Sequence, residues 1–203
     1  MRLRIREFVI RLIDIIGALI GLIISAVPVF ITSLFVKKDG GDIFFKQERI
    51  GQHGKHFVMW KIRSMVVDAE IIRKSLIGQS DVNGMFKMKD DPRITPVGKF
   101  IRKHSLDELP QFWNVLKGEM SLVGPRPALE EEFKKYTELE KGRLKVKPGL
   151  TGLWQVSGRS NVDFDTMIAL DLDYIARRSV WLNIVILAKT VWLILPSDKN
   201  GAY

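Results

Sequence analysis

Two adjacent acidic residues, Asp107 and Glu108, stand in a segment that could do chemistry on a phosphate group. They lie within Ser105-Leu106-Asp107-Glu108-Leu109-Pro110. A serine followed three residues later by a glutamate is also a capping box, and acidic residues in a first helical turn suit the helix dipole without any function. Pro110 weakens that structural interpretation, because with Ser105 as N-cap it would fall at the fifth helical position, where its ring clashes with the preceding turn. From these residues alone both interpretations stay open.

Basic residues gather in or beside the turn-rich segments around this acidic pair. A carboxylate that attacks or holds phosphate needs neighbouring cations, which lower its pKa and neutralise the phosphoryl oxygens. Charged runs are more often solvated faces, but Arg126 stands between Pro125 and Pro127, an unusual place for a merely solvated arginine. The candidate cations are Lys61, Arg63, Arg93, Arg102, Lys103, Arg126 and Arg159.

The composition limits the possible partners and chemistry. The 203 residues carry a net charge of +9, which points to nucleic acid, acidic lipid headgroups or a phosphate-rich substrate. The absence of cysteine excludes disulfides, zinc–thiolate sites and a cysteine nucleophile, and the 3 histidines form no HExxH. There is no GxxxxGK[ST], no GxGxxG after a predicted strand and no GxSxG. The sequence therefore argues against a P-loop NTPase or a Rossmann enzyme.

An apolar segment near the N-terminus predicts a membrane helix. Residues 15–36 carry no charge, and as a helix at ~1.5 Å per residue they cover roughly 33 Å, enough to cross a hydrocarbon core of ~30 Å. The run is too long for the core of a cleaved signal peptide. A charged fraction of 27% excludes a polytopic membrane protein. We therefore expect a membrane segment with its flanks at 1–38, joined to one domain at 39–203.

The placement of this helix in a membrane is open from the residues alone. Positive flanks favour the cytoplasmic side, so a helix that enters and turns back would keep both flanks there, whereas a straight span would send one across. Pro28 offers a turning point because it cannot donate to the carbonyl of Ile24, and Ser25 could satisfy a freed carbonyl. A single-pass anchor with a harmless kink fits equally well. The basic flanks are Arg2, Arg4, Arg6 and Arg11 before the segment, and Lys37 and Lys38 after it.

The remaining residues predict a single α-rich α+β domain. The pattern predicts strands at 43–46 and 57–62, helices at 66–77, 97–103, 111–116, 129–144 and 163–178, and loops at 90–93, 124–127 and 148–159. The helix at 111–116 is amphipathic. The apolar stretch 181–195 reaches only ~22 Å as a helix, so it should not span a membrane. A core helix and an interfacial helix both fit it.

Around the acidic pair the chain resembles the bacterial sugar transferases, the monotopic polyprenyl-phosphate phosphoglycosyl transferases. The resemblance covers nearly the whole sequence and rests on long, specific blocks. They are residues 90–127, which include DDPRITPVG, SLDELPQ and MSLVGPRP; residues 147–159, KPGLTGLWQVSGR; and residues 57–65, which end in KIRSM.

This resemblance implies a reaction and the residues that perform it. Members of the family move a sugar-1-phosphate from a UDP-sugar to polyprenyl phosphate. The aspartate of their Asp-Glu dyad, here Asp107, takes up the sugar-phosphate as a covalent acyl-phosphate, uridine monophosphate (UMP) leaves, and the lipid phosphate then attacks. The glutamate, here Glu108, is associated with the required Mg²⁺. A carboxylate nucleophile divides one transfer into two, so both substrates use one site in turn.

Further positions of the family's site carry over residue by residue. Its anion-binding positions fall on Lys61, Arg102, Arg126 and Arg159. An Asp-x-x-Tyr near the nucleotide site falls on Asp171 and Tyr174, one helical turn apart. Arg63 and Arg93 complete the candidate substrate-binding residues.

The family also implies a location and partners. Its anchor is a re-entrant helix that stays in one leaflet, accompanied by interfacial amphipathic helices, with the catalytic domain on the cytoplasmic face of the bacterial inner membrane. The family's helix break has Ser directly before Pro, whereas here Val27 precedes Pro28 and Ser25 lies three residues back. We expect membrane lipids as partners, no nucleic acid, and a homo-oligomer as an open possibility. Assembly of exopolysaccharide or lipopolysaccharide is the pathway class implied.

The sugar and one competing function stay open. The ending Asn200-Gly201-Ala202-Tyr203 resembles the longer branch of the family, whose members carry several transmembrane helices ahead of this domain and tend to use hexose-1-phosphate. Galactose or glucose is therefore expected, with an N-acetylated sugar as the alternative. A non-enzymatic membrane adaptor with a basic face for acidic lipid or nucleic acid would need neither Asp107 nor Glu108. Against it, the basic residues do not form one contiguous stripe.

Overall fold

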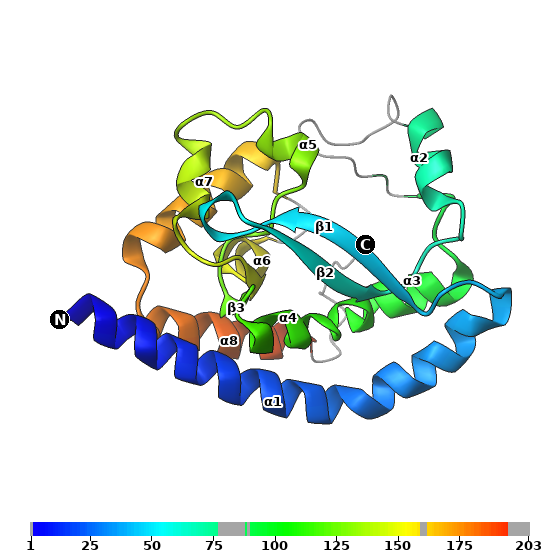
Figure 1. Ribbon diagram of the computed structural model, residues 1–203, viewed down its shortest axis with the longest axis horizontal. Coiled ribbons are helices and arrows are strands. Elements are labelled where there is room, and N and C mark those ends of the chain that lie inside the picture. The colour runs from blue at the N-terminus through cyan, green and yellow to red at the C-terminus, as the bar shows by residue number, and fades with distance from the viewer. Residues whose placement is uncertain (1, 77–87, 89, 159–161, 195–203) are drawn as a thin grey trace.

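The structure, a computed structural model, describes residues 2–76, 88, 90–158 and 162–194. A long N-terminal helix runs along one side of the molecule, and shorter helices, an antiparallel hairpin and a parallel pair of strands lie above it (Figure 1). The α+β prediction is therefore confirmed at the level of a mixed helical and stranded fold that begins with a long apolar helix.

Helix α1 (Arg2–Val36) packs one face against the domain and leaves its other faces exposed. Ile10, Asp14, Ala18, Ser25 and Thr32 are buried on the packed face, at the spacing of successive helical turns. The apolar residues that this helix exposes are Leu3, Ile5, Phe8, Leu12, Ile16, Leu19, Ile20, Ile23, Ile24, Val27, Phe30, Ile31, Leu34 and Phe35.

Two glycines let α1 approach the domain closely. A Cβ atom added at Gly17 would lie 2.5 Å from Leu122 Cδ1, and one added at Gly21 would lie 2.5 Å from Phe112 Cε1. The GxxxG pattern thus forms a close-packing face within the chain itself.

The helix break expected at Ser25 and Pro28 stays a prediction, and the structure shows how the backbone is arranged there. The helix is continuous through Pro28 and is drawn as one bowed rod in Figure 1. Ser25 Oγ donates to the carbonyl of Leu22 at 3.2 Å rather than to that of Ile24. Beyond the proline, Thr32 Oγ1 donates back to the carbonyl of Pro28 at 2.7 Å. Packing of one face along the domain supports the helix on both sides of Pro28, and its re-entrant placement in a bilayer stays a prediction.

Strands β1 (Phe44–Ile50) and β2 (His56–Ile62) form the predicted hairpin. Its turn is the 3₁₀ helix η2 (Gln52–Gly54), where Gly54 takes a φ of 75°. Strand β1 runs longer than predicted because it pairs with β2 along its whole length, and Ile50 at its end also pairs with Ala128. A short 3₁₀ helix, η1 (Lys37–Asp39), connects α1 to the hairpin.

Two helices follow the hairpin. Helix α2 (Ala69–Leu76) begins later than predicted. Helix α3 (Pro96–Lys103) begins after Thr95, whose side chain accepts from the Gly98 amide. A Cβ atom at Gly98 would lie 1.8 Å from the Ser64 carbonyl oxygen, so only glycine lets α3 lie this close to the segment that follows β2.

The segment after the acidic pair builds the centre of the molecule. Helix α4 (Gln111–Lys117) leads into β3 (Ser121–Val123), which pairs in parallel with β4 (Gly149–Thr151). Residues 148–159 were expected to be a loop, but they contain β4 and the short helix α6 (Leu153–Ser157). Glycine has a low propensity for strands, so the local sequence does not favour a strand at Gly149. Pairing with β3 stabilises the strand there.

The single solvated helix predicted at 129–144 is wrong. The structure has a short α5 (Glu130–Phe133) and a 3₁₀ helix η5 (Glu140–Lys145) instead. The Thr137 amide and hydroxyl both bond to Glu140, which starts a new turn there. Glu132 and Arg143 are buried in ion pairs, so this segment is packed rather than solvated.

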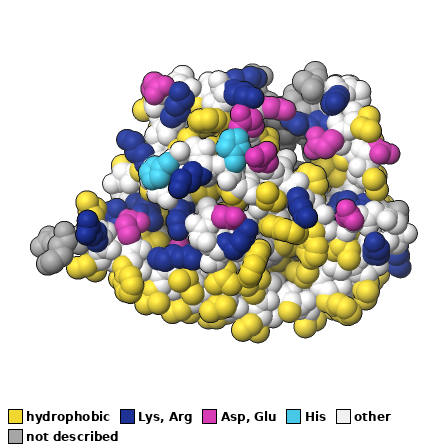
Figure 2. Space-filling model, in the orientation of Figure 1, with side chains coloured by type: hydrophobic (Ala, Val, Ile, Leu, Met, Phe, Trp, Pro, Cys, Tyr) yellow, Lys and Arg dark blue, Asp and Glu magenta, His cyan; other side chains and the backbone are white. Residues whose placement is uncertain are grey.

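Helices α7 (Phe164–Arg177) and α8 (Val180–Ile194) complete the fold. Helix α8 contributes to the core through Asn183 and Ile186, which are buried, and exposes Trp181 and Trp192 by 72% and 76%; an interfacial position stays a prediction. The main core draws on α1, β2, α4, β3, α7 and α8. Figure 2 shows hydrophobic side chains along the α1 side of the molecule and charged side chains gathered on the opposite side.

Candidate active site

The acidic pair lies on a short 3₁₀ helix, η4 (Leu106–Glu108), between α3 and α4. Ser105 precedes it with φ 54° and ψ 25°, a left-handed conformation that is costly for a residue other than glycine. The serine side chain makes no capping hydrogen bond, and Pro110 serves as the N-cap of α4. The capping-box interpretation is therefore wrong, and on this short helix Asp107 is buried while Glu108 is partly exposed.

Asp107 is a buried carboxylate beside a lysine. It is 7% exposed, and burial raises the pKa of its carboxyl group. The charge of Lys61 opposes that rise, Glu108 adds to it, and Arg102 opposes it at longer range. A raised pKa makes a carboxylate more basic when ionised, and the two cations favour the ionised form that a nucleophile requires.

Lys61 bridges the two carboxylates from strand β2. Its Nζ lies 3.0 Å from Glu108 Oε1 and 3.8 Å from Asp107 Oδ2. The side chains of Lys61 and Glu108 are 22% and 43% exposed, whereas that of Asp107 is only 10% exposed. The arrangement therefore presents a buried acid with an accessible cation and an accessible second acid, as phosphoryl transfer requires.

Three other predicted arginines are placed by this structure. Arg102 comes from the last turn of α3 and acts on Asp107 through its charge. Arg93 forms a buried pair with Asp91, with Nη2 at 2.6 Å from Oδ2, and donates through Nε to Oδ1 at 2.9 Å. Arg63 donates to the carbonyls of Asp42 and Val36 and so holds the end of β2 to the end of α1. The bonds of Arg63 and Arg93 hold loops in place, and their binding of substrate stays a prediction.

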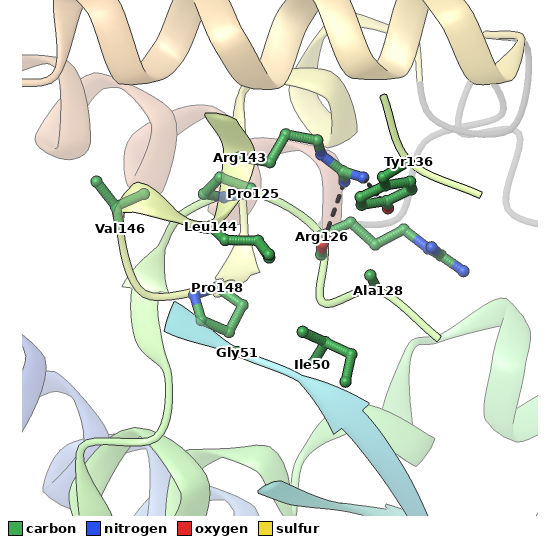
Figure 3. Close-up of a pocket in the computed structure, with 10 residues that line it drawn as sticks. All are labelled: Ile50, Gly51, Pro125, Arg126, Ala128, Tyr136, Arg143, Leu144, Val146 and Pro148. Carbon is green, nitrogen blue, oxygen red and sulfur yellow. Dashed lines mark hydrogen bonds between the residues drawn. The ribbon is translucent and has the colours of Figure 1, made fainter. Parts of the chain in front are cut away.

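Arg126 lies at the other end of the site in the irregular segment 124–127, as predicted. Its guanidinium pairs with Glu132, with Nη1 at 2.8 Å from Oε2 and Nη2 at 3.2 Å from Oε1. A small pocket adjoins it, and Figure 3 shows Arg143 reaching across this pocket to Tyr136 and to the Arg126 backbone. The pocket is lined by Ile50, Gly51, Pro125, Arg126, Ala128, Tyr136, Arg143, Leu144, Val146 and Pro148.

Asp171 and Tyr174 lie inside the protein and hold this loop in place. Asp171 Oδ2 accepts from Arg143 Nη2 at 2.5 Å and from the Arg126 amide at 3.3 Å. The single proton of the Tyr174 hydroxyl is shared between two acceptors, the carbonyl of Val123 at 3.1 Å and Asn183 Oδ1 at 2.9 Å. Both residues are at most 1% exposed, so in this conformation they act on the site through Arg126 and β3.

Two buried polar residues that hold the segments around the dyad, Asn114 and Arg49, were not singled out from the sequence. Asn114 is fully buried and ties α4 to the edge of β2, donating to the Val58 carbonyl at 2.7 Å and accepting from the Trp60 amide at 3.2 Å. Arg49 is buried beside Arg126 and donates to the Pro127 carbonyl at 3.1 Å. Asn114 falls within a resemblance block, which was a signal available for it. Arg49 lies in a strand and looks like an ordinary outward-facing charge.

The predicted roles of Arg159 and of Mg²⁺ are not tested by the structure. Arg159 lies outside the described residues. Within the described part of the chain, no cluster of three or more histidine, aspartate or glutamate residues could hold a metal ion alone. Asp107 and Glu108 are therefore an incomplete ligand set that would need substrate oxygens to complete it.

Comparison with known proteins places the chain in a family. A family profile described as bacterial sugar transferase matches residues 5–197. The galactosyl transferase CpsE of Streptococcus agalactiae serotype III is 51% identical in an alignment of 187 positions that covers 91% of this chain and 42% of that protein. The undecaprenyl-phosphate galactose phosphotransferase of Salmonella typhimurium is 45% identical in an alignment of 205 positions that covers 98% of this chain and 43% of that protein.

A third relative bears a different sugar in its name. The UDP-glucose:undecaprenyl-phosphate glucose-1-phosphate transferase of Klebsiella pneumoniae is 41% identical in an alignment of 194 positions that covers 90% of this chain and 39% of that protein. The chain thus spans less than half the length of each of these relatives. With the profile covering most of its length and the dyad set among cations, this chain belongs to the bacterial sugar transferase family.

Proposed function

We propose that this protein transfers a sugar-1-phosphate from a UDP-sugar to polyprenyl phosphate, in the first membrane step of glycan assembly. The observation that carries the proposal is the buried Asp107 carboxylate with Lys61 Nζ 3.8 Å away and a strained Ser105 ahead of it. The names of the relatives support galactose or glucose as the sugar. An N-acetylated sugar remains the alternative donor.

The first half-reaction uses Asp107 as a nucleophile. An ionised oxygen of its carboxylate attacks the phosphorus that bears the sugar, and a new acyl-phosphate bond forms as the bond to the neighbouring phosphate breaks. The leaving UMP takes the electron pair of that bond. Lys61 lies where its charge would lower the cost of bringing a phosphate against the ionised acid.

The second half-reaction returns the enzyme to its starting state. An oxygen of polyprenyl phosphate attacks the same phosphorus, a diphosphate linkage forms between lipid and sugar, and the Asp107 carboxylate leaves. One site then serves both substrates in turn, which predicts ping-pong kinetics. The exposure of Glu108 and Lys61 leaves this side of the dyad accessible to each substrate.

The residues present fit a Mg²⁺ ion that binds together with substrate. Mg²⁺ usually takes one or two carboxylates and completes its shell with water and phosphate oxygens. Glu108, with Asp107 beside it, would supply the protein ligands, which agrees with the lack of a larger acidic cluster in the described residues. When bound, the ion would offset negative charge on the diphosphate and on the leaving group.

We place the protein at the bacterial inner membrane with the dyad on the cytoplasmic side. Among the described residues, α1 is the one helix long and apolar enough to cross a membrane by length and composition. The exposed tryptophans Trp113, Trp181 and Trp192 suit the interface between lipid and water. The basic flanks of α1 favour the cytoplasmic side at both ends and support a re-entrant helix.

Release of UMP tests the proposal directly. The purified protein in lipid, with Mg²⁺ and polyprenyl phosphate, is given UDP-galactose, UDP-glucose and UDP-N-acetylated sugars one at a time. We expect release with one donor, lost in Asp107→Asn and kept in the matched control Asp165→Asn, an exposed position on α7. Mass spectrometry of the protein without acceptor should find the sugar-phosphate on Asp107. A folded, reconstituted protein that releases no UMP from any donor would refute the proposed reaction.

A further inference from the structure

Arg49 is a buried cation without an acidic partner in the described part of the chain. It is 8% exposed and belongs to β1. Its Nε and Nη2 donate to Gln47 Oε1 at 3.2 and 2.6 Å, and its Nη1 donates to the carbonyl of Pro127 at 3.1 Å. All these acceptors are neutral. A guanidinium carries five N–H donors, so three bonds leave two donors for another group.

A charge in this position is expensive unless an anion joins it. Taking a cation out of water costs several kcal/mol, and neutral acceptors offset only part of that cost. Burial, followed by repulsion from Arg126, lowers the pKa of Arg49 to about 9, and Glu132, Glu108 and Tyr136 oppose the change. Arg49 and Arg126 repel each other through their charges, and Glu132 forms its ion pair with Arg126 rather than with Arg49, which leaves the charge of Arg49 in excess.

The hairpin places Arg49 on the same face as Lys61, the lysine beside Asp107 and Glu108. Alternate residues of a strand share a face, and β1 pairs Phe45 with Lys61 and Arg49 with Phe57. Lys61 and Arg49 therefore lie on one face of the hairpin, about 13 Å apart along the strand at ~3.3 Å per residue. The Pro127 carbonyl and the pairing of Ile50 with Ala128 bring the loop of Arg126 to the Arg49 end.

We propose that Arg49 and Arg126 together bind a phosphate oxyanion of a substrate, at the end of the site opposite Lys61. The inference rests on the proposed function and extends it with a residue that the sequence did not single out. Arg126 uses two of its five side-chain N–H donors on Glu132, so its remaining donors can also bind a phosphate oxygen. The oxyanion belongs either to the nucleotide, on the phosphate that leaves as UMP, or to the polyprenyl phosphate.

The two sources are separated by two measurements on the full-length protein in lipid. The first is equilibrium binding of UMP, which needs no turnover, and the second is the KM for polyprenyl phosphate. Each is made on wild type, Arg49→Gln, Arg49→Lys and the control Arg177→Gln, an exposed arginine on α7. Because a hydrogen bond to a charged group contributes roughly 1.5–3 kcal/mol, Arg49→Gln should weaken its ligand about ten- to hundredfold. Arg49→Lys keeps the charge but loses the planar guanidinium with its paired donors. Its ligand affinity should therefore lie between those of wild type and Arg49→Gln.

The outcomes decide both the proposal and its source. Weaker UMP binding with an unchanged lipid KM assigns the nucleotide phosphate, and the reverse assigns the lipid phosphate. If neither changes in a folded Arg49→Gln protein, the proposal is overturned. Removing an uncompensated buried charge should leave the melting temperature unchanged or raise it, so a large fall together with equal losses of all activities would also overturn it. Wild-type turnover in the same series tests the proposed function separately.

Discussion

Removing the Lys61 charge tests whether this lysine favours the ionised form of the nucleophile. Lys61→Met keeps much of the side-chain volume and takes away the cation that lies 3.8 Å from Asp107 Oδ2. Two unit charges at that distance interact by roughly 4 kcal/mol at an effective dielectric of ~20, and by about 1 kcal/mol in water. The lysine is 22% exposed, so its contribution lies between these limits. The corresponding loss in kcat/KM is roughly five- to thousandfold at neutral pH.

The sign of the pH effect makes the test specific. Lys61 opposes the rise that burial imposes on the pKa of Asp107, so its loss should raise that pKa further. The carboxyl then ionises only at higher pH, and the acid limb of the kcat/KM profile should move to higher pH, with activity partly regained in alkaline buffer. Lys55→Met, in the exposed turn of the hairpin, is the control. A uniform loss at every pH, with an unmoved acid limb, would refute this reasoning.

Three further predictions concern stability and can be measured by thermal unfolding. Folding raises the pKa of Asp107, so the stability that its protonated form contributes is lost as pH rises through that pKa. At neutral pH Asp107→Asn should therefore have a higher melting temperature than wild type. The difference in melting temperature should close in acid, where Asp107 is protonated. Gly98→Ala should cost about 3 kcal/mol or more, because its Cβ would lie 1.8 Å from a backbone oxygen, and a variant as stable as wild type would contradict that contact. Asn114→Ala should lower the free energy of unfolding by roughly 2–4 kcal/mol and reduce UMP release, because the Val58 carbonyl and the Trp60 amide lose their side-chain partner. An unchanged melting temperature of this variant would contradict the prediction.

Elements with a strong local signal were predictable from the sequence. The long apolar helix, the hairpin, and helices α3, α4 and α7 follow from periodicity, caps and turns within each segment. The helix at 129–144 was wrong because tertiary packing overrode local preference. Glu132 and Arg143 turn inward there to buried partners.

The residues of the site stay a prediction, and their geometry could not be read from the sequence. The resemblance named Asp107, Glu108 and Lys61, which the structure brings within 4 Å of one another through Lys61. It could not indicate that Ser105 is left-handed, because no single-residue pattern demands that conformation of a serine. It also missed Arg49, since burial of a strand arginine depends on a loop more than seventy residues away in sequence, joined at the Pro127 carbonyl.

The packing of α1 changes what removing it would mean. Its residues Ala18 and Ile13 belong to the same core as β2, α4 and α8, and Asp14 accepts from the Ser121 hydroxyl and the Leu122 amide, each at 2.9 Å. A truncated chain that starts after Val36 would therefore open the core and strand these polar groups, rather than release an intact soluble enzyme. Both α1 and α8 expose apolar side chains in addition to those that they bury, so the exposed apolar surface is not confined to one helix. Helix α1 is therefore a structural part of the domain and not an appendage to it.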